Sequence, residues 1–430
     1  MTVANVGNGA VFRRLLRVFA ILAERAVLLG WLFLRHVALG RRRFGPVLDG
    51  WLADTVVAIG PAFVKAAQML STRADVLPPR VCRALARLHD RVRPEPVDAS
   101  DVTAALRAEG LPVADGTTAR LIGAGSIACV YQVWLSDGRS VAVKARRPGM
   151  VRSLTHDLAL LNRVAGLAAR TPMLHGVPVT DIVGRLCDSI HAQLDLAREA
   201  SLLDEFGRSM RAEPGVVIPA VDHQLSTSDR IVMEYVPNLV RRRPSEFVDA
   251  DRERAVRTAL RAVYRMLFLD GVVHCDLHPG NLYPRTDGTV VIVDAGFTVR
   301  LSDTARERFA AFFYCMSQGD GPACADIVLS TATNTDERAD PAGFRAELTD
   351  LIERNAGRPA IEFDLVRFAT ALFDLQRRHG FYADPQFVFP ILSLLVLEGV
   401  IREYHPTLDF QREARPFLAM AMFECVAKTV

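Results

Sequence analysis

Lysine is almost absent from this chain. Only three of its 52 basic residues are lysines, at positions 65, 144 and 428, and the other 49 are arginines. A compositionally biased genome is the simple explanation for such a ratio. The two cations are not interchangeable where a site needs a compact ammonium group, so each remaining lysine marks a candidate site. We therefore begin from Lys65 and Lys144.

Further absences argue against whole classes of protein. The net charge of +3 is too small for nucleic-acid binding through charge alone, so no nucleic-acid partner is expected. Seven scattered cysteines without a C-x-x-C pair are typical of reduced structural thiols and not of a disulfide scaffold or zinc site. The apolar stretches 26–34 and 387–397 fall well short of the roughly 20 residues that span a membrane. Arginines and no small-residue cleavage site follow the first stretch, so no secretory signal is expected either.

The positive charge that is present is concentrated at the N-terminus. Residues 1–50 contain eight arginines against two acidic residues, which leaves the remainder of the chain at −3. Residues 11–38 are predicted to form one long helix whose charged side chains fall within about 140° of arc, with apolar residues around the rest. Such a helix either docks on the protein's own body or lies on anionic lipid. We keep both interpretations open.

Changes in composition and in predicted secondary structure divide the chain into four segments. They are a basic amphipathic helix at 1–46, a helical extension at 47–116, a strand-rich segment with a helical insertion at 117–237, and a mostly helical segment at 238–430. Gly60-Pro61 and Pro78-Pro79 interrupt the extension, and a proline-rich connector at 93–96 ends its main part.

The strand-rich segment has its own internal order. A β-meander with a turn at Asp137-Gly138 is predicted over 119–145, followed by helical periodicity at 151–168 and 180–209. A strand pair is predicted at 216–221 and 230–236. In the last segment, Asp287-Gly288 predicts a hairpin within 272–298.

The strongest chemical signal lies within residues 271–296. His274, Asp276 and Asn281 follow the pattern H-x-D-L-x-x-x-N, and Asp294 comes 18 residues after Asp276 at the end of the strand V-V-I-V-D. At this spacing an aspartate can orient or deprotonate a nucleophile, while an asparagine and a second aspartate hold Mg²⁺ against nucleotide phosphates. The pattern predicts catalysis by Asp276 and metal binding by Asn281 and Asp294.

A matching phosphate-binding signal lies upstream. Gly123, Ala124, Gly125 and Ser126 form a glycine-rich turn, and V-A-V-K, ending at Lys144, follows it. Lys144 is predicted to reach the phosphates of ATP and to pair with a glutamate on a later helix, for which Glu199 is the best candidate. The alternative for Lys144 is an ordinary surface lysine. In I-V-M-E-Y-V-P, Glu234 to Val236 are placed where a kinase hinge binds adenine.

Over most of residues 50–410 the sequence resembles the UbiB-like atypical kinases, also called the AarF or ADCK family. The most specific part is G-P-A-F-V-K-A-A-Q-M-L-S-T-R-A-D-V-L-P-P at 60–79, which is similar to the family's K-x-G-Q signature with Lys65 and Gln68 as its defining residues. The resemblance implies an α+β, two-lobed protein-kinase-like fold with a helical N-terminal extension. It also implies that Lys65 and Gln68 regulate access to the active site.

The sequence departs from the family pattern at several positions. Ala67 replaces the signature glycine, and Gly123 and Gly125 replace two alanines of the family's nucleotide loop, which would free the backbone to approach phosphate and to adopt positive φ. The family's E-x-D reads Gln193-Leu194-Asp195, so Lys65 would depend on Asp195. The metal loop is D-A-G instead of D-F-G, so phenylalanine packing cannot set its state.

The resemblance implies an enzyme, an atypical kinase-like ATPase that uses ATP and Mg²⁺ in isoprenoid-quinone or lipid metabolism. Candidate partners are membrane lipid, quinone precursors and biosynthetic enzymes. The location expected is the cytoplasm, with peripheral attachment to the inner face of the cell membrane as a further candidate. Two alternatives stay open: a small-molecule phosphotransferase of the aminoglycoside or choline kinase type, and a nucleotide-binding scaffold without turnover.

Overall fold

A computed structural model describes residues 8–39, 44–71, 79–88, 99–170, 179–335, 339–355 and 362–429. The chain divides into two compact units. The N-terminal unit comprises residues 1–197 and 225–232, and the C-terminal unit comprises residues 198–224 and 233–430. Among the described residues, no helix combines the length and apolarity needed to cross a bilayer.

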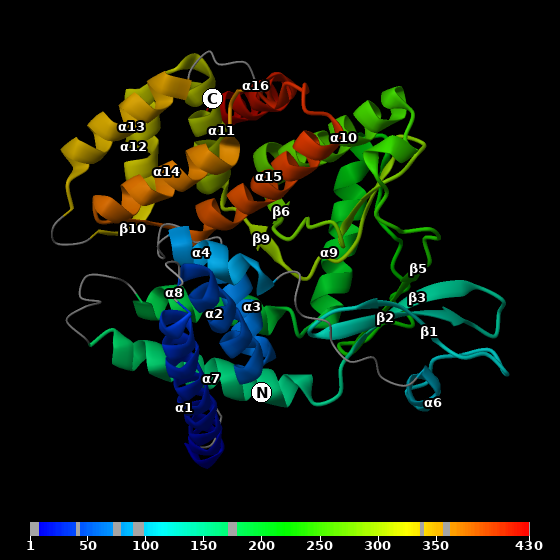
Figure 1. Cartoon of the computed structure of the whole chain (residues 1–430). Coiled ribbons are helices and arrows are strands. Elements are labelled where there is room, and N and C mark those ends of the chain that lie inside the picture. The colour runs from blue at the N-terminus through cyan, green and yellow to red at the C-terminus, as the bar shows by residue number, and fades with distance from the viewer. Residues whose placement is uncertain are drawn as a thin grey trace. The chain divides into compact units, whose positions relative to one another are not determined.

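Helices form the larger part of the N-terminal unit (Figure 1). They are α1 (Asn8–Ala38), α2 (Gly45–Ile59), α3 (Pro61–Leu70), α4 (Pro79–Ala86), α6 (Ala99–Ala108), α7 (Met150–Ala168) and α8 (Val179–Ala192). Gly60 separates α2 from α3 with a φ of 141°, a conformation that favours glycine, and Pro61 begins α3. The predicted break at Gly60-Pro61 is therefore confirmed. The connector at 93–96 and positions 72–78 of the 60–79 motif lie outside the described residues.

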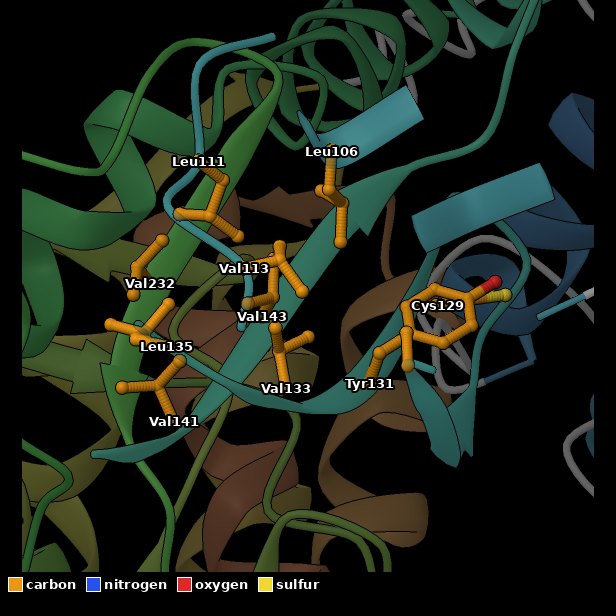
Figure 2. Packing of buried hydrophobic residues seen from close by; sticks show 11 residues of the cluster. Leu106, Leu111, Val113, Cys129, Tyr131, Val133, Leu135, Val141, Val143 and Val232 are labelled. Carbon is orange, nitrogen blue, oxygen red and sulfur yellow. The ribbon is translucent and has the colours of Figure 1, made fainter. Parts of the chain in front are cut away.

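The sheet of the N-terminal unit has the strand order β1-β2-β3-β5. Its strands are β1 (Arg120–Ala124), β2 (Ala128–Trp134), β3 (Ser140–Arg146) and β5 (Arg230–Glu234). The first three are antiparallel, which confirms the predicted meander. Figure 2 shows the hydrophobic core of this sheet, to which Leu106 of α6 and Val133, Val143 and Val232 of the strands belong.

The C-terminal unit is also mainly helical. Its helices are most of α9 (Leu196–Ser209), then α10 (Asp249–Tyr264), α11 (Asp303–Gln318), α12 (Gly321–Thr331), α13 (Pro341–Asn355), α14 (Leu365–Arg378), α15 (Pro385–Tyr404) and α16 (Phe410–Thr429) (Figure 1). A π-helical turn, Arg265–Asp270, follows α10 and ends at Gly271, whose φ is 66°. Short 3₁₀ turns lie at Met210–Ala212 and Pro244–Glu246.

Short strands of the C-terminal unit surround its polar turns. They are β4 (Val216–Val217), β6 (Val272–His274), β7 (Leu282–Pro284), β8 (Val290–Ile292), β9 (Thr298–Arg300), β10 (Ala332–Thr335) and β11 (Phe381–Ala383). β7 and β8 form the predicted hairpin around Asp287-Gly288. The predicted pairing of 216–221 with 230–236 is wrong for β4, which lies parallel to β8, while Val221 and Met233 form a single bridge.

The predicted helical run 180–209 is broken in the structure. α8 ends at Ala192, and α9 starts afresh at Leu196. Asp195 explains the restart, because its carboxylate accepts a hydrogen bond from the Ala197 amide (3.1 Å) in the first turn of α9. Arg146 of β3 donates to the Leu194 carbonyl (2.6 Å), which holds the break against the sheet.

Candidate functional site

His274 organises the loop that follows β6. Its side chain is buried, and burial lowers the pKa of the imidazole because the charged form loses hydration. The backbone amide of Asp276 donates to Nδ1 (3.1 Å), and Nε2 lies 3.5 Å from the Val293 carbonyl. A neutral ring with its proton on Nε2 satisfies both contacts. His274 thus links the turn at Asp276 to the strand end that precedes Asp294.

Asp276 and Asn281 belong to one closed turn. The Asn281 side chain is buried, and its amide nitrogen donates to the Asp276 carbonyl at 2.8 Å. The Asn281 carbonyl accepts from the Val293 amide at 2.9 Å. These bonds place both predicted residues next to the end of β8, while the Asp276 carboxylate stays about one-quarter exposed. The structure therefore brings together the two residues that the H-x-D-L-x-x-x-N spacing selected.

Asp294 has a conformation that non-glycine residues rarely adopt. Its φ is 64°, in the left-handed region, which costs on the order of 1 kcal/mol. Its carboxylate accepts from the Gly296 amide (2.9 Å), and this bond supports the turn. A buried Glu199 accepts from the next amide, that of Ala295, at 3.2 Å. A Cβ added at Gly296 would lie 3.1 Å from Asp294 Oδ1 and 3.3 Å from Glu199 Oε2, so both carboxylates adjoin this glycine.

Hydrogen bonds therefore fix the D-A-G loop at Ala295, the position that a phenylalanine occupies in a D-F-G loop. Ala295 is fully buried, its amide is bonded to Glu199, and its carbonyl accepts from the Thr298 hydroxyl (2.8 Å). Sequence reasoning predicted Glu199 as the partner of Lys144 and missed its bond to Ala295. The two residues are 96 positions apart, and nothing in the local pattern indicates their contact.

This part of the C-terminal unit offers a set of oxygen donors. A carboxylate at Asp294 and an amide oxygen at Asn281 are hard ligands of the kind that Mg²⁺ prefers. Within the described ranges there is no group of three or more His, Cys, Asp or Glu side chains able to hold a metal. One or two protein ligands completed by phosphate and water are, however, the usual environment of Mg²⁺ in nucleotide sites.

Lys144 lies in the N-terminal unit, in the middle of the sheet. It is on β3 opposite Val130 of β2, and its exposed fraction is 9%. A buried ammonium is costly, so this position is not that of an ordinary surface lysine. The surface alternative is wrong.

The glycine-rich turn joins β1 to β2 close to this lysine's strand. The Gly125 amide donates to the Ala128 carbonyl (2.9 Å), and the Gly125 carbonyl accepts from Arg147 Nε (3.1 Å). Neither Gly123 nor Gly125 adopts positive φ, so that part of the expectation is wrong. A ligand can still reach the backbone of this turn, since Ala124 and Gly125 are exposed and Ser126 is half-buried.

Residues 61–70 of the 60–79 motif form α3, within the helical part of the N-terminal unit. Lys65 and Gln68 are both half-buried, and the Gln68 amide donates to the Leu88 carbonyl at 3.2 Å. Ala67, which replaces the signature glycine, packs with Ala53, Leu85 and Leu88. The methyl group of Ala67, which the signature glycine would lack, therefore contributes to this hydrophobic cluster.

The residues in place of the E-x-D signature have separate local roles. Gln193 is buried, and its side-chain amide donates to the Ser189 carbonyl (3.3 Å) of the preceding helix, α8. Asp195 is exposed and caps α9. Glu234, at the predicted hinge, is exposed and donates its amide to the Ala220 carbonyl (2.8 Å), while Val236 is half-buried.

Comparison with protein families gives a direct match. Residues 117–328 match the ABC1 atypical kinase-like domain. A "Probable protein kinase UbiB" from Marinobacter nauticus is 28% identical over 382 residues, which cover 84% of this chain and 67% of the relative. A protein of the same name from Xanthomonas campestris pv. campestris is 29% identical over 388 residues, covering 85% of this chain and 68% of the relative.

A solved structure is similar in fold. The Rv3197–erythromycin complex from Mycobacterium tuberculosis matches with a TM-score of 0.51 and 19% identity, over 79% of this chain and 91% of that chain. At this identity the likeness shows the fold alone. Together with the domain match, it identifies a kinase-like fold of mixed helix and sheet with a helical N-terminal region.

Proposed function

Because the chain is similar to the UbiB-like atypical kinases, we propose that it binds ATP with Mg²⁺ and hydrolyses it in support of isoprenoid-quinone or lipid metabolism at a membrane surface. One observation carries the proposal. The hydrogen bonds around His274 place the carboxylates and the amide of the predicted kinase motif in a single group of turns.

The proposal gives each residue of the C-terminal unit a task. Asp276 orients the attacking water and takes its proton, and Asn281 and Asp294 bind the metal. His274 keeps the Asp276 amide in place through its Nδ1, and its burial lowers the pKa of the ring. Glu199 holds the metal loop through the Ala295 amide.

The residues present fit a magnesium ion. Their donors are carboxylate and amide oxygens, and the left-handed conformation of Asp294 with its bond to Gly296 keeps one carboxylate in a defined direction. When bound, Mg²⁺ would neutralise charge on the phosphates during transfer. Asn281 and Asp294 would hold it.

In the N-terminal unit, we assign phosphate binding to Lys144 and to the turn from Gly123 to Ser126. We assign adenine binding to the segment from Glu234 to Val236, which belongs to the C-terminal unit. Lys144 sits on a rigid strand, which suits a group that must position phosphates. The proposed pairing of Lys144 with Glu199 follows the kinase pattern.

Lys65 and Gln68 are proposed to regulate nucleotide access, with Asp195 replacing the family's acidic partner and Gln193 acting as a helix-bound neighbour. If the compact ammonium matters, Lys65→Arg should change the selectivity between ATP and other nucleotides although it keeps the charge. Nucleotide affinities measured by calorimetry test this. Wild-type selectivity in Lys65→Arg would show that lysine scarcity reflects composition alone.

Hydrolysis of ATP by the wild type, by Asp294→Asn and by Asp287→Asn tests the main proposal. Asp287 is a matched control, because it lies in the adjoining hairpin, where its carboxylate accepts from Thr289 and lies 4.0 Å from Arg285 Nε. We expect Asp294→Asn to lower turnover by about 100-fold or more and Asp287→Asn to leave it unchanged. Vesicles and a quinone-precursor phenol, added separately, should stimulate the wild type.

The other outcomes assign the protein differently. Transfer of phosphate to an added amino sugar or to choline would identify a small-molecule phosphotransferase. Nucleotide binding without turnover in the wild type would identify a scaffold. Equal loss of turnover in both aspartate variants would remove Asp294 from the proposed metal site.

A further inference from the structure

Helix α1 docks on the N-terminal unit through its charged edge. Arg14 forms an ion pair with the fully buried Asp157 of α7 and donates to the Ile59 carbonyl at the end of α2 (2.7 Å). Trp51 of α2 donates to the Arg25 carbonyl at 2.7 Å, and His36 is buried. The docking interpretation is therefore correct, but the side that docks is not the apolar one.

A helical wheel at 100° per residue separates α1 into three parts. The docked stripe contains Arg14, Val18, Ile21, Arg25 and His36, and Val18 packs with Ile59, Ala159 and Leu160. Next to it runs a strip of exposed charged residues, Arg13, Arg17, Glu24 and Arg35. Between Phe12 and Val37, the remaining arc, about 140° wide, carries no polar or charged side chain.

We name this remaining arc the outer face of α1. Its large residues are all exposed, from 42% at Leu15 to 75% at Val27. They are Phe12, Leu15, Leu16, Phe19, Leu22, Val27, Phe33, Leu34 and Val37. An ordinary surface helix buries its apolar face on the protein, and this helix presents it outward.

We propose that the outer face of α1 binds the surface of an anionic lipid bilayer. The helix has 31 residues and is about 46 Å long at 1.5 Å per residue, and its outer face runs along most of that length. Its six charged residues argue against spanning, and an apolar arc bordered by arginines is the pattern of a helix lying in the membrane interface. Trp31, at the border of the arc, has the Arg35 guanidinium 5.4 Å from its ring centre, which suits the headgroup depth.

A second copy of the chain is a poorer occupant. Two helices that pair use a narrow seam of about two residues in seven, whereas the outer face of α1 is apolar over more than a third of the circumference. A flat lipid surface contacts such an arc along its whole width. The charge also favours anionic lipid, because the exposed strip has three arginines against one glutamate and Arg41, Arg42 and Arg43 follow in the sequence.

Vesicle flotation of the full chain tests the proposal, with phosphatidylcholine vesicles that either contain or lack phosphatidylglycerol. We expect binding to the anionic vesicles and a decrease with added salt. Phe19→Ser combined with Leu34→Ser should lower the partition coefficient at least about tenfold. Val164→Ser combined with Leu167→Ser, which changes exposed apolar residues of α7, should have no effect.

The arginine strip is tested separately. Arg13→Gln combined with Arg17→Gln should weaken binding to anionic vesicles about fivefold for each arginine and leave binding to neutral vesicles unchanged. Arg152→Gln, on the exposed side of α7, is the matched control. Trp31 emission should shift to the blue on binding and be quenched by brominated lipid, a signal that Trp31→Phe removes. Unchanged thermal unfolding midpoints show that the variants fold.

Three results would overturn the proposal: no binding to phosphatidylglycerol vesicles, equal losses in the α7 controls, or a dimer in solution that Phe19→Ser with Leu34→Ser dissolves. The last would assign the outer face of α1 to a second copy. The readout involves no nucleotide, so its failure leaves the proposed ATP chemistry in place, and failure of ATP hydrolysis leaves this proposal in place.

Discussion

The two units hold their motif residues by different means. In the N-terminal unit, Lys144 and the glycine-rich turn sit on or beside paired strands, and Lys65 and Gln68 lie on a packed helix. In the C-terminal unit, Asp276, Asn281 and Asp294 occupy irregular turns, and side-chain bonds to the backbone shape those turns.

In the N-terminal unit, the residues that hold the structure differ from the residues predicted to do the chemistry. In the C-terminal unit, the same residues do both. Regular elements position the motif residues of the N-terminal unit, so changing those side chains should leave the frame intact. In the C-terminal unit, the motif side chains themselves hold the turns in shape through hydrogen bonds. A substitution there should therefore affect stability and chemistry together. The most sensitive residue of the N-terminal unit should then lie outside its motifs.

Arg14→Leu should have the largest effect on stability. It leaves the Asp157 carboxylate buried without its cation, and breaking a buried pair costs about 3–5 kcal/mol. Urea unfolding monitored for the N-terminal unit measures the loss. The exposed neighbour Arg13→Leu should change little, and Arg14→Leu with Asp157→Leu should recover much of the loss. A loss of unfolding free energy below about 1 kcal/mol would contradict this difference between the units, because the fold of the N-terminal unit would then not depend on the Arg14–Asp157 pair.

Glu199→Ala should cost about 1–3 kcal/mol, because the buried Ala295 amide loses its acceptor. Glu199→Gln keeps an acceptor oxygen and should retain most of the stability while it removes the charge. Denaturant unfolding of both variants distinguishes the roles. If Ala and Gln destabilise equally, the charge and not the hydrogen bond holds the loop, and the distinction between the units becomes weaker.

His274 should make stability depend on pH. Burial lowers its pKa in the folded state below the ordinary 6.5, so below that pH the unfolded chain binds a proton that the folded chain does not. The free energy of unfolding is therefore complete above pH 6.5 and falls as the pH decreases, by up to about 1.4 kcal/mol per pH unit. In His274→Asn, which keeps an acceptor for the Asp276 amide, this dependence should flatten. An unchanged pH profile would contradict the assignment.

Gly125→Ala should have the smallest effect, below about 1 kcal/mol. Its new Cβ would lie 3.1 Å from the Ala128 carbonyl oxygen, so the turn must shift by a few tenths of an ångström. We expect a modest change in ATP affinity, about two- to fivefold by calorimetry. Gly123→Ala is the matched control, because its Cβ meets Val130 only at an ordinary 3.6 Å. Unchanged affinity in the double variant would show that these glycines do not alter nucleotide handling.

Local features of the fold could be predicted from the sequence. The meander, the hairpin at Asp287-Gly288 and the break at Gly60-Pro61 depend on turn residues and short-range periodicity, and all three are confirmed. The break at Gln193–Asp195 was missed, because helical periodicity continues through it while Asp195 caps a new helix. The partner of β4 was also missed, since parallel pairing with β8 joins residues more than 70 positions apart.

The candidate site shows the same division. Asp276 and Asn281 are five residues apart, so a single turn brings them together and the motif spacing already contains that geometry. The bond from Ser393 to the His274 carbonyl joins residues 119 positions apart, and no local pattern indicates it. The same holds for Glu199 and Ala295.

The sequence by itself determined the resemblance to the UbiB-like kinases, the oxygen donors of the kinase-like motif and the amphipathic character of α1, because these depend on residue type and short spacing. Only the tertiary structure decided that Lys144 is buried, that burial lowers the pKa of His274 and that Arg14 of α1 faces the interior. Each of these depends on desolvation by residues distant in the chain. A charged side chain is stable in the interior only where a neighbouring element provides an oppositely charged partner, as Asp157 of α7 does for Arg14.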